Sequence, residues 1–194
     1  MRYKFLFILL LLCVQSYAQK VRIDRVEADG THHVMTSPKK VKFGKGKYNF
    51  SLAYYQKEDS VSWRLVVSSY TFISESSEIL IKLGNDSIIN LKCSFVNEGS
   101  IKDATYGIYL GAGITYYTPE TEKTYYTSVF EIPSKSLDDL DYWVITKIRF
   151  FTGTDYYDKK IYDDEFGKFI AKSRKNIQKR ITQKSQKSNL YNGF

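Results

Sequence analysis

Apolar and polar side chains alternate along most of this chain, and a period of two is typical of β-strands. The stretch YNFSLAYY places four large residues on one side of such a strand: Tyr48, Phe50, Leu52 and Tyr54. The stretch VSWRLVVS repeats the pattern with Val61, Trp63, Leu65 and Val67. β-Branched and aromatic residues suit the pleated, half-buried surface of a sheet. The spacing therefore predicts strands joined by short turns without intervening helices, which implies antiparallel sheets.

The clearest hairpin is EILIKLGNDSIINLKC, in which a turn separates two alternating runs. The apolar positions before and after the turn are Ile79, Ile81 and Leu83, then Ile89, Leu91 and Cys93. The turn itself, Gly84-Asn85-Asp86, contains residues that tolerate the positive φ of tight hairpins. A further strand is predicted at YWVITKIRFF, with one side formed by Val144, Thr146, Ile148 and Phe150.

One segment departs from the period of two. From Asp163 onward the apolar positions recur about every 3.6 residues, and they share one helical face: Phe166, Phe169, Ile170, Ser173, Ile177 and Ile181. Acidic residues lead this segment and basic residues follow, which complements the helix dipole and provides an N-cap. We predict a helix over about 163–183 and a frayed tail over 184–194. Ser136 is expected to cap a single helical turn at SLDDL.

These elements predict a mainly β fold: an antiparallel β-sandwich or strongly curved sheet with a C-terminal amphipathic α-helix packed on it. An α+β roll is the alternative. No Gly/Ser linker and no repeat of fixed period divides the chain, so we expect one domain over 19–183. Only Cys93 lies beyond residue 18, so the core must rest on packing without an intramolecular disulfide.

The first 18 residues resemble a cleaved signal peptide. Two basic residues precede an apolar run of ten residues, 5–14, and Ser16-Tyr17-Ala18 places small residues at the cleavage positions. Ten helical residues rise about 15 Å, which is too short for a bilayer core of roughly 30 Å. Leu12 before Cys13 is too large for a lipoprotein signal, which argues against a lipid anchor. We expect export to the periplasm or the extracellular space, with no transmembrane segment in the mature chain.

The formal net charge of +8 is concentrated near the C-terminus. From Lys168 onward there are eight basic residues and no acidic ones, whereas the rest of the mature chain is nearly neutral. The charge is thus a property of one predicted helix, which argues against nucleic-acid binding. The polar side of that helix is expected to be solvated. Weak contact with anionic lipid or lipopolysaccharide is the alternative.

The glycines and histidines predict no cofactor and no metal. Gly107, Gly111 and Gly113 lack the spacing of a dinucleotide-binding fingerprint, and a tyrosine-rich strand follows them instead of a helix. His32 and His33 are adjacent, so on a strand they point to opposite faces and do not share a metal ion. No cysteine or acidic cluster joins them at ligand spacing.

Two other patterns could serve catalysis, and a structural explanation is favoured for each. Cys93 continues an apolar alternation, as a small core residue would. Carboxylate pairs occur at Asp138-Asp139 and Asp163-Asp164, and a glycosidase needs two carboxyls across a cleft. Both pairs lie where helix N-termini are expected, which accounts for them without chemistry. No catalytic residue is predicted, and enzymatic activity is left open without being favoured.

Two tyrosine doublets form the predicted ligand-binding site. In a hairpin centred near Thr121, Tyr116-Tyr117 would face Tyr125-Tyr126. Because side chains alternate along a strand, each doublet gives one tyrosine to each face of the sheet. The inner pair would join the core, and the outer pair would form an aromatic platform suited to a saccharide ring or a partner protein. A cross-strand pair that only stabilises the sheet is the alternative.

Part of the chain resembles small uncharacterised exported proteins of Gram-negative bacteria. The similarity runs from DSVSWRLVVSS through the predicted hairpin to LDDLDYWVITKIRF and the terminal helix, about half of the mature chain. Matching positions in the hairpin are Ile79, Ile81, Leu83, Asn85, Asp86, Ile89 and Leu91. Ile145, Lys147, Ile148 and Phe150 match the later strand in part. The resemblance implies an antiparallel β fold in the cell envelope, and it implies no activity and no functional residues.

Three functions remain open from the sequence. The favoured one is a non-enzymatic exported binding module whose aromatic sheet surface holds a saccharide or a protein. The first alternative is a carboxylate-dependent hydrolase of envelope or dietary polymers, which would need a cleft with two facing carboxyls. The second is a structural subunit of an envelope assembly.

Overall fold

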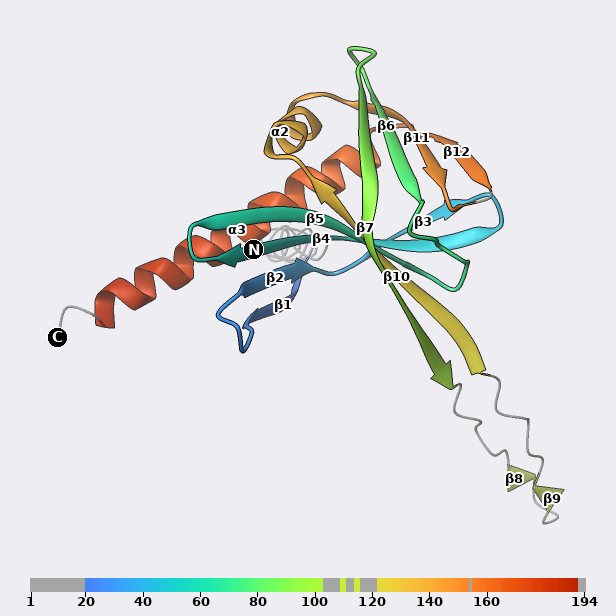
Figure 1. Cartoon of the computed structure of the whole chain (residues 1–194), viewed down its shortest axis with the longest axis horizontal. Helices are drawn as coiled ribbons and strands as arrows, with labels where there is room; N and C mark the ends of the chain where they lie inside the picture. Colours follow the sequence, from blue (N-terminus) through green and yellow to red (C-terminus); the bar gives the residue numbers. More distant parts are fainter. Residues whose placement is uncertain (1–19, 103–108, 111–113, 116–121, 154, 192–194) are drawn as a thin grey trace, which may run out of the picture.

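The computed structural model describes residues 20–102, 109–110, 114–115, 122–153 and 155–191. It confirms a mainly antiparallel β fold with a C-terminal helix (Figure 1). Ten strands form one sheet: β1 (Val21–Val26), β2 (His32–Thr36), β3 (Lys39–Phe43), β4 (Gly46–Lys57), β5 (Ser60–Ser69), β6 (Glu78–Leu83), β7 (Ile88–Lys102), β10 (Glu122–Ile132), β11 (Ile145–Phe151) and β12 (Tyr156–Lys160). A second pair is β8 (Tyr109–Leu110) with β9 (Ile114–Thr115), and the helices are α2 (Ser134–Tyr142) and α3 (Glu165–Tyr191).

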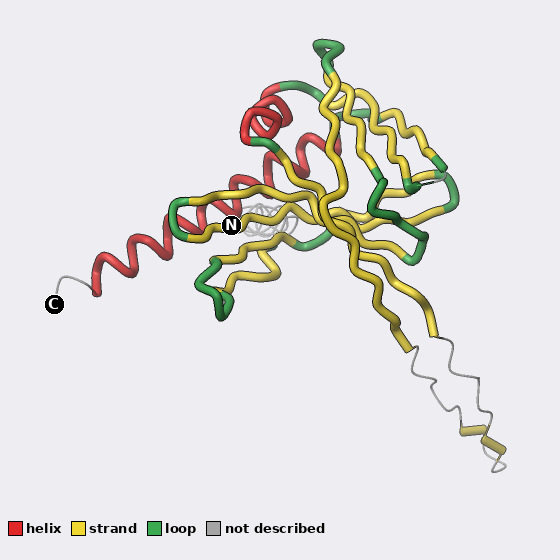
Figure 2. The backbone as a smooth tube through the Cα atoms, in the orientation of Figure 1, coloured by secondary structure: helices red, strands yellow, loops and turns green. Residues whose placement is uncertain are grey.

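The sheet is strongly curved, and the long strand β7 takes part in both of its halves, pairing with β6 in one and with β10 in the other. The strand order is β1-β2-β4-β5-β10-β7-β6-β11-β12, with β3 also paired to β4. β7 pairs with β6 over residues 88–92 and with β10 over residues 93–102. The curvature brings β12 back toward β3, where a side chain at Gly44 would lie 2.8 Å from the Tyr157 ring. Figure 2 shows the strands of the two halves crossing near the middle of the molecule.

The core lies inside this curve and is rich in aromatic rings. Phe150 from β11 is fully buried, and its ring lies 5.0 Å from that of Tyr48 and 6.1 Å from that of Phe130. All four residues predicted for one side of the strand in β4 are buried: Tyr48, Phe50, Leu52 and Tyr54. The alternation therefore identified the inner face correctly on this strand.

α3 covers the open side of the curved sheet with the face predicted from the sequence. Phe166, Phe169, Ile170, Ser173 and Ile177 are buried, and Ile181 packs against the core at its edge. The Phe166 ring meets that of Phe50 edge-on at 5.3 Å, which holds the start of the helix against β4. The helix continues to Tyr191, past the expected end near residue 183.

The two helices are joined by an arginine clamp. Arg174 of α3 donates to Asp138 at 2.8 Å and also to Asp141, both on α2. α2 begins at Ser134 directly after Pro133, so the prediction that Ser136 caps it is wrong. Proline is favoured near a helix start because it lacks an N–H group and has a helical φ. Asp138-Asp139 consequently lie well inside the helix and not at its N-terminus as predicted.

Two details of the strands differ from the simple alternation. In β11 the register shifts between Ile145 and Lys147, so Thr146 is an extra, bulged residue. Ile145 is therefore buried, while Val144 and Thr146 are exposed, and their predicted inward orientation is wrong. In the β6–β7 turn it is Asp86 that adopts a positive φ, 65°.

Candidate ligand-binding surface

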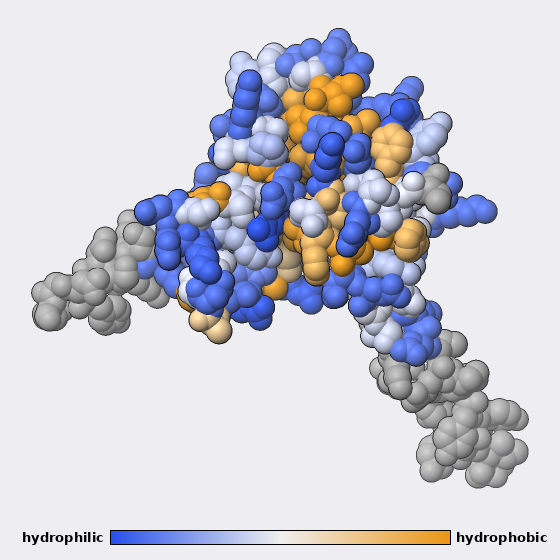
Figure 3. Space-filling view, in the orientation of Figure 1, coloured by the Kyte–Doolittle hydropathy of each residue, from blue (hydrophilic) through white to orange (hydrophobic). Residues whose placement is uncertain are grey.

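Several large apolar side chains of the described residues are exposed to solvent. In the face drawn in Figure 3, hydrophobic atoms form patches bordered by charged residues over the sheet. Tyr70 is 57% exposed, Phe72 54% and Phe95 56%, and all three lie on or beside strands β5 and β7. Scattered exposed apolar residues are ordinary, whereas neighbours that contact one another indicate a surface with a role.

The two tyrosines of the second doublet point to opposite faces of β10, as predicted. Tyr126 packs against the core, on the side of the buried Ser128 and Phe130. Its ring meets that of Phe72 at 5.4 Å. Tyr125 must therefore project from the outer face, where its ring meets that of Tyr70 edge-on at 5.5 Å and 65°. The outer tyrosine thus has an aromatic partner, which comes from the segment after β5.

The cross-strand neighbours of this doublet differ from those predicted. Tyr125 pairs with Gly99 and Tyr126 with Glu98, both on β7. A hairpin centred near Thr121 is therefore wrong, since β10 pairs with β7 from Glu122 onward. The first doublet, Tyr116-Tyr117, lies outside the described residues, as do Gly107, Gly111 and Gly113.

Gly99 stands opposite Tyr125 and therefore places no side chain of its own beside the ring. A Cβ built at Gly99 would have no atom within 4 Å among the described residues. We call Tyr70, Tyr125 and the open position over Gly99 the aromatic platform. The open position over Gly99 has room for a ligand group, such as a planar ring or a puckered sugar ring, that packs against the Tyr125 ring.

Polar side chains lie next to the platform on the same outer face. Thr127, two residues along β10 from Tyr125, pairs with Asn97 on one side and with Ser68 on the other. Residues two apart on a strand share a face, so this row of hydroxyl and amide groups borders the platform. The surface therefore combines aromatic area with hydrogen-bonding groups that are not charged.

Tyr70, Ser68 and Asn97 were missed as site residues, although a sequence signal for Tyr70 exists. Ser68 and Tyr70 alternate with the buried Val67 and Ser69, which places them on the outward side although β5 itself ends at Ser69. What the sequence did not reveal was the long-range register that brings Tyr70 beside Tyr125.

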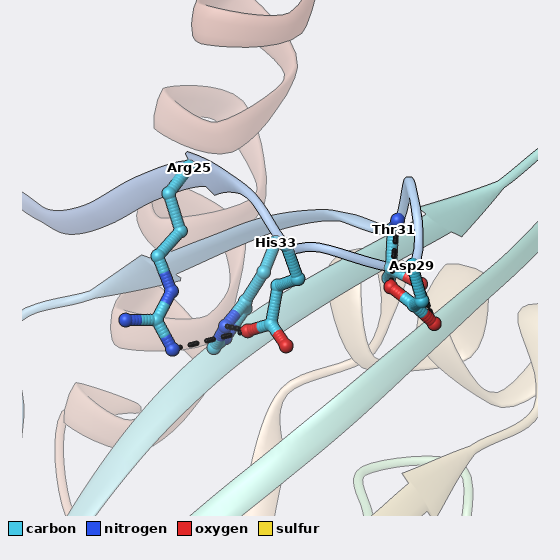
Figure 4. A network of polar contacts seen from close by, with 5 residues as sticks. Arg25, Asp29, Thr31 and His33 are labelled. Carbon is cyan, nitrogen blue, oxygen red and sulfur yellow. Dashed lines mark hydrogen bonds and ion pairs between the residues drawn. The ribbon is translucent and has the colours of Figure 1, made fainter.

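The two histidines have different carboxylate partners, Asp24 for His32 and Glu27 for His33. Figure 4 shows His33 and its polar contact, with Arg25 close by. The Nε2 atom of His32 lies 2.9 Å from an Asp24 carboxylate oxygen. His33 is buried, its Nδ1 lies 3.3 Å from a Glu27 carboxylate oxygen, and its ring stacks on that of Tyr55 at 4.2 Å. Burial lowers the pKa of His33, with the carboxylate of Glu27 acting in the opposite direction. Within the described part of the chain, no three His, Cys, Asp or Glu side chains gather as a metal site.

One residue of each predicted carboxylate pair has a structural partner. Asp138 is held by Arg174, and an Asp164 carboxylate oxygen accepts the Ile145 N–H at 3.0 Å. The pKa shifts resolved for acidic residues are all downward, in Glu27, Asp29, Asp86 and Asp158, because each carboxylate accepts hydrogen bonds or faces a cation. A general acid needs a raised pKa, which none of these four has.

Cys93 sits at the point where β7 changes partner. Its side chain is half-buried against the core, its Sγ lies 3.3 Å from the Phe95 carbonyl oxygen, and burial raises the pKa of the thiol. A reactive thiolate would need the opposite shift. The position therefore agrees with packing, as the alternation predicted.

No protein-family model, curated protein or solved structure matches this chain. Neither helix in the described part of the chain combines the length and the apolar content needed to cross a bilayer.

Proposed function

We propose that this chain is an exported, non-enzymatic binding module that holds a saccharide on the aromatic platform. The observation that carries the proposal is the edge-on contact of Tyr125 with Tyr70 beside the open position over Gly99. Export is supported by the signal-like pattern of residues 1–18.

A saccharide suits this surface because its two kinds of group meet complementary partners. The C–H face of a sugar ring can pack on the Tyr125 ring, and its hydroxyls can exchange hydrogen bonds with Asn97, Thr127 and Ser68. Tyrosine offers a large rigid area with few rotatable bonds, which limits the entropy lost on binding.

The hydrolase alternative has less support. One pocket, lined by Leu80, Ile88 and basic residues, has no carboxylate in its lining. Another, beside the start of α3, has only Glu165, which already pairs with Lys39 at 3.3 Å. Glycoside hydrolysis uses two carboxyls about 5–10 Å apart.

The proposal is tested with the chain from Gln19 onward, which contains all described residues. A glycan array identifies a ligand, and calorimetry then measures its affinity for the wild type and for Tyr125→Ala and Tyr70→Ala. We expect each substitution to weaken binding at least about tenfold, or 1.4 kcal/mol. Tyr162→Ala is the matched control, since Tyr162 is 76% exposed and lies elsewhere.

Gly99→Thr separates binding from stability. The position has free space and an unstrained φ, and threonine favours strands, so the melting temperature should hold or rise. The new side chain would nevertheless occupy the place of the ligand and abolish binding. Retention of full glycan affinity by Gly99→Thr, or equal losses in the Tyr162 control, would refute the platform.

One observation favours the assembly alternative. Among the described strands, none pairs with the second edge of β7 over residues 94–102, and Phe95 beside that edge is 56% exposed. Free strand edges accept further strands. Light scattering across a concentration series distinguishes the two functions, since a subunit would form oligomers that Val96→Pro disrupts, whereas a monomeric binding module would remain unaffected.

A further inference from the structure

A row of lysines crosses the outer face of the second half of the sheet. Lys82 on β6 pairs with Lys147 on β11, and Lys147 pairs in turn with Lys160 on β12. Ile88 of β7 continues the row on the other side of Lys82. Three side chains of like charge thus stand directly opposite one another on neighbouring strands.

This arrangement works against the stability of the sheet. Like charges directly opposite each other are destabilising. Lysines do protect edge strands from unwanted pairing, and that explains Lys160 on the terminal strand β12. It does not explain Lys82 and Lys147, whose strands are paired on both sides. A bound anion would remove the conflict.

The carboxylates nearby neutralise only part of the positive charge. Asp86 pairs with Lys82 at 2.8 Å. Asp158 is shared, lying 2.6 Å from Lys147 while also accepting two hydrogen bonds from Arg149. Lys82, Lys147 and Arg149 thus share two carboxylates, and Lys160 adds a further positive charge to the row, so this surface keeps an excess of positive charge.

A pocket of about 190 Å³ opens among these cations. Lys82, Lys147 and Arg149 line it, and Leu80 and Ile88 supply its apolar part. Ile88 is 62% exposed, so its side chain is available to a ligand. The volume is below that of pockets for drug-sized molecules, which suits a headgroup with a short apolar chain.

We propose that this pocket binds an alkyl phosphate. The phosphate lies between Lys82, Lys147 and Arg149, and the alkyl chain lies on Leu80 and Ile88. Lysine ammonium groups bind phosphate as point charges, and a dianion matches the excess of cations better than a carboxylate does. The apolar part distinguishes the site from an unspecific basic surface. The proposal does not depend on the aromatic platform, because the two surfaces share no residue.

Calorimetry of the chain from Gln19 onward with butyl phosphate tests the site directly. We expect saturable binding at low ionic strength, at least tenfold tighter than for inorganic phosphate or butanol. Lys147→Gln should weaken binding at least fivefold. Lys40→Gln is the matched control, because it removes the same charge from an exposed lysine on β3 and should change the affinity less than twofold.

A second variant should raise the affinity for butyl phosphate instead of lowering it. Asp158→Asn removes the carboxylate that competes with the ligand for Lys147 and Arg149, so butyl phosphate should bind at least threefold tighter. A merely structural cluster would show no such gain. Ile88→Ser should lower the affinity for butyl phosphate toward that for inorganic phosphate.

A vesicle-binding experiment distinguishes a lipid headgroup from a free alkyl phosphate as the ligand. Binding to vesicles of phosphatidylcholine with phosphatidic acid, lost in Lys147→Gln but kept in Lys40→Gln, would identify a lipid headgroup. Butyl phosphate binding without vesicle binding would identify a free alkyl phosphate. Absence of saturable binding, or equal losses in Lys147→Gln and Lys40→Gln, overturns the proposal.

Discussion

Truncation of Phe150 to alanine should be among the most damaging single changes in this chain. The side chain is fully buried, and its ring lies within 6.5 Å of those of Phe43, Tyr48, Phe50 and Phe130. Loss of a buried phenylalanine costs about 3–5 kcal/mol in transfer and cavity energy. A cost of about 4 kcal/mol corresponds to a fall of roughly 8–16 °C in melting temperature at this chain length.

Its neighbour Phe151 provides the control, because the same atoms are removed from the same strand. Phe151 points outward, is half-buried and contacts Tyr156 at 5.9 Å, so Phe151→Ala should cost less than about 1.5 kcal/mol. Urea unfolding followed by far-UV circular dichroism measures both variants. If Phe150→Ala and Phe151→Ala lowered the free energy of unfolding by amounts that agree within about 1 kcal/mol, the two faces of β11 would have been assigned wrongly.

Three further outcomes are expected. The pKa of His33 is lowered in the folded state, so stability is full above about pH 6.5 and falls as the pH drops toward the folded pKa; urea midpoints between pH 7.5 and 5.5 should fall less in His33→Gln. Gly167→Ala should destabilise by about 1–3 kcal/mol despite better helix propensity, because its Cβ would strike the Asp164 carboxylate; a rise in melting temperature would contradict this contact. Cys93, half-buried with a raised pKa, should react with a thiol reagent at pH 8 at least about fivefold more slowly than free cysteine, and urea should remove the difference.

The sequence predicted those parts of the fold that depend on local pattern. Ile79 and Ile81 pair with Leu91 and Ile89 as the alternation required, because two short runs around one turn leave little choice of register. The face of α3 was likewise predicted correctly, since a period of 3.6 with an acidic start is a local signal.

The errors lie where local pattern is interrupted or where distant strands meet. The bulge at Thr146 inserts one residue, and every earlier position then faces the other way. Tyr125 meets Tyr70 because β10 pairs with β5, a strand far away in the sequence, and alternation does not reveal the register of such a long-range pairing. The alternation thus predicted that one tyrosine of the doublet points outward, but it revealed neither which tyrosine that is nor its aromatic partner.

The placement of α3 has a consequence for the order in which the molecule is made. The aromatic inner face of the sheet is complete once β12 has been synthesised, but it stays open to water until Phe166 through Ile177 arrive from the last described element. A nascent chain released before α3 is made would therefore expose a large apolar concave surface, which chaperones and proteases recognise. The arrival of α3 thus completes the burial of the aromatic core.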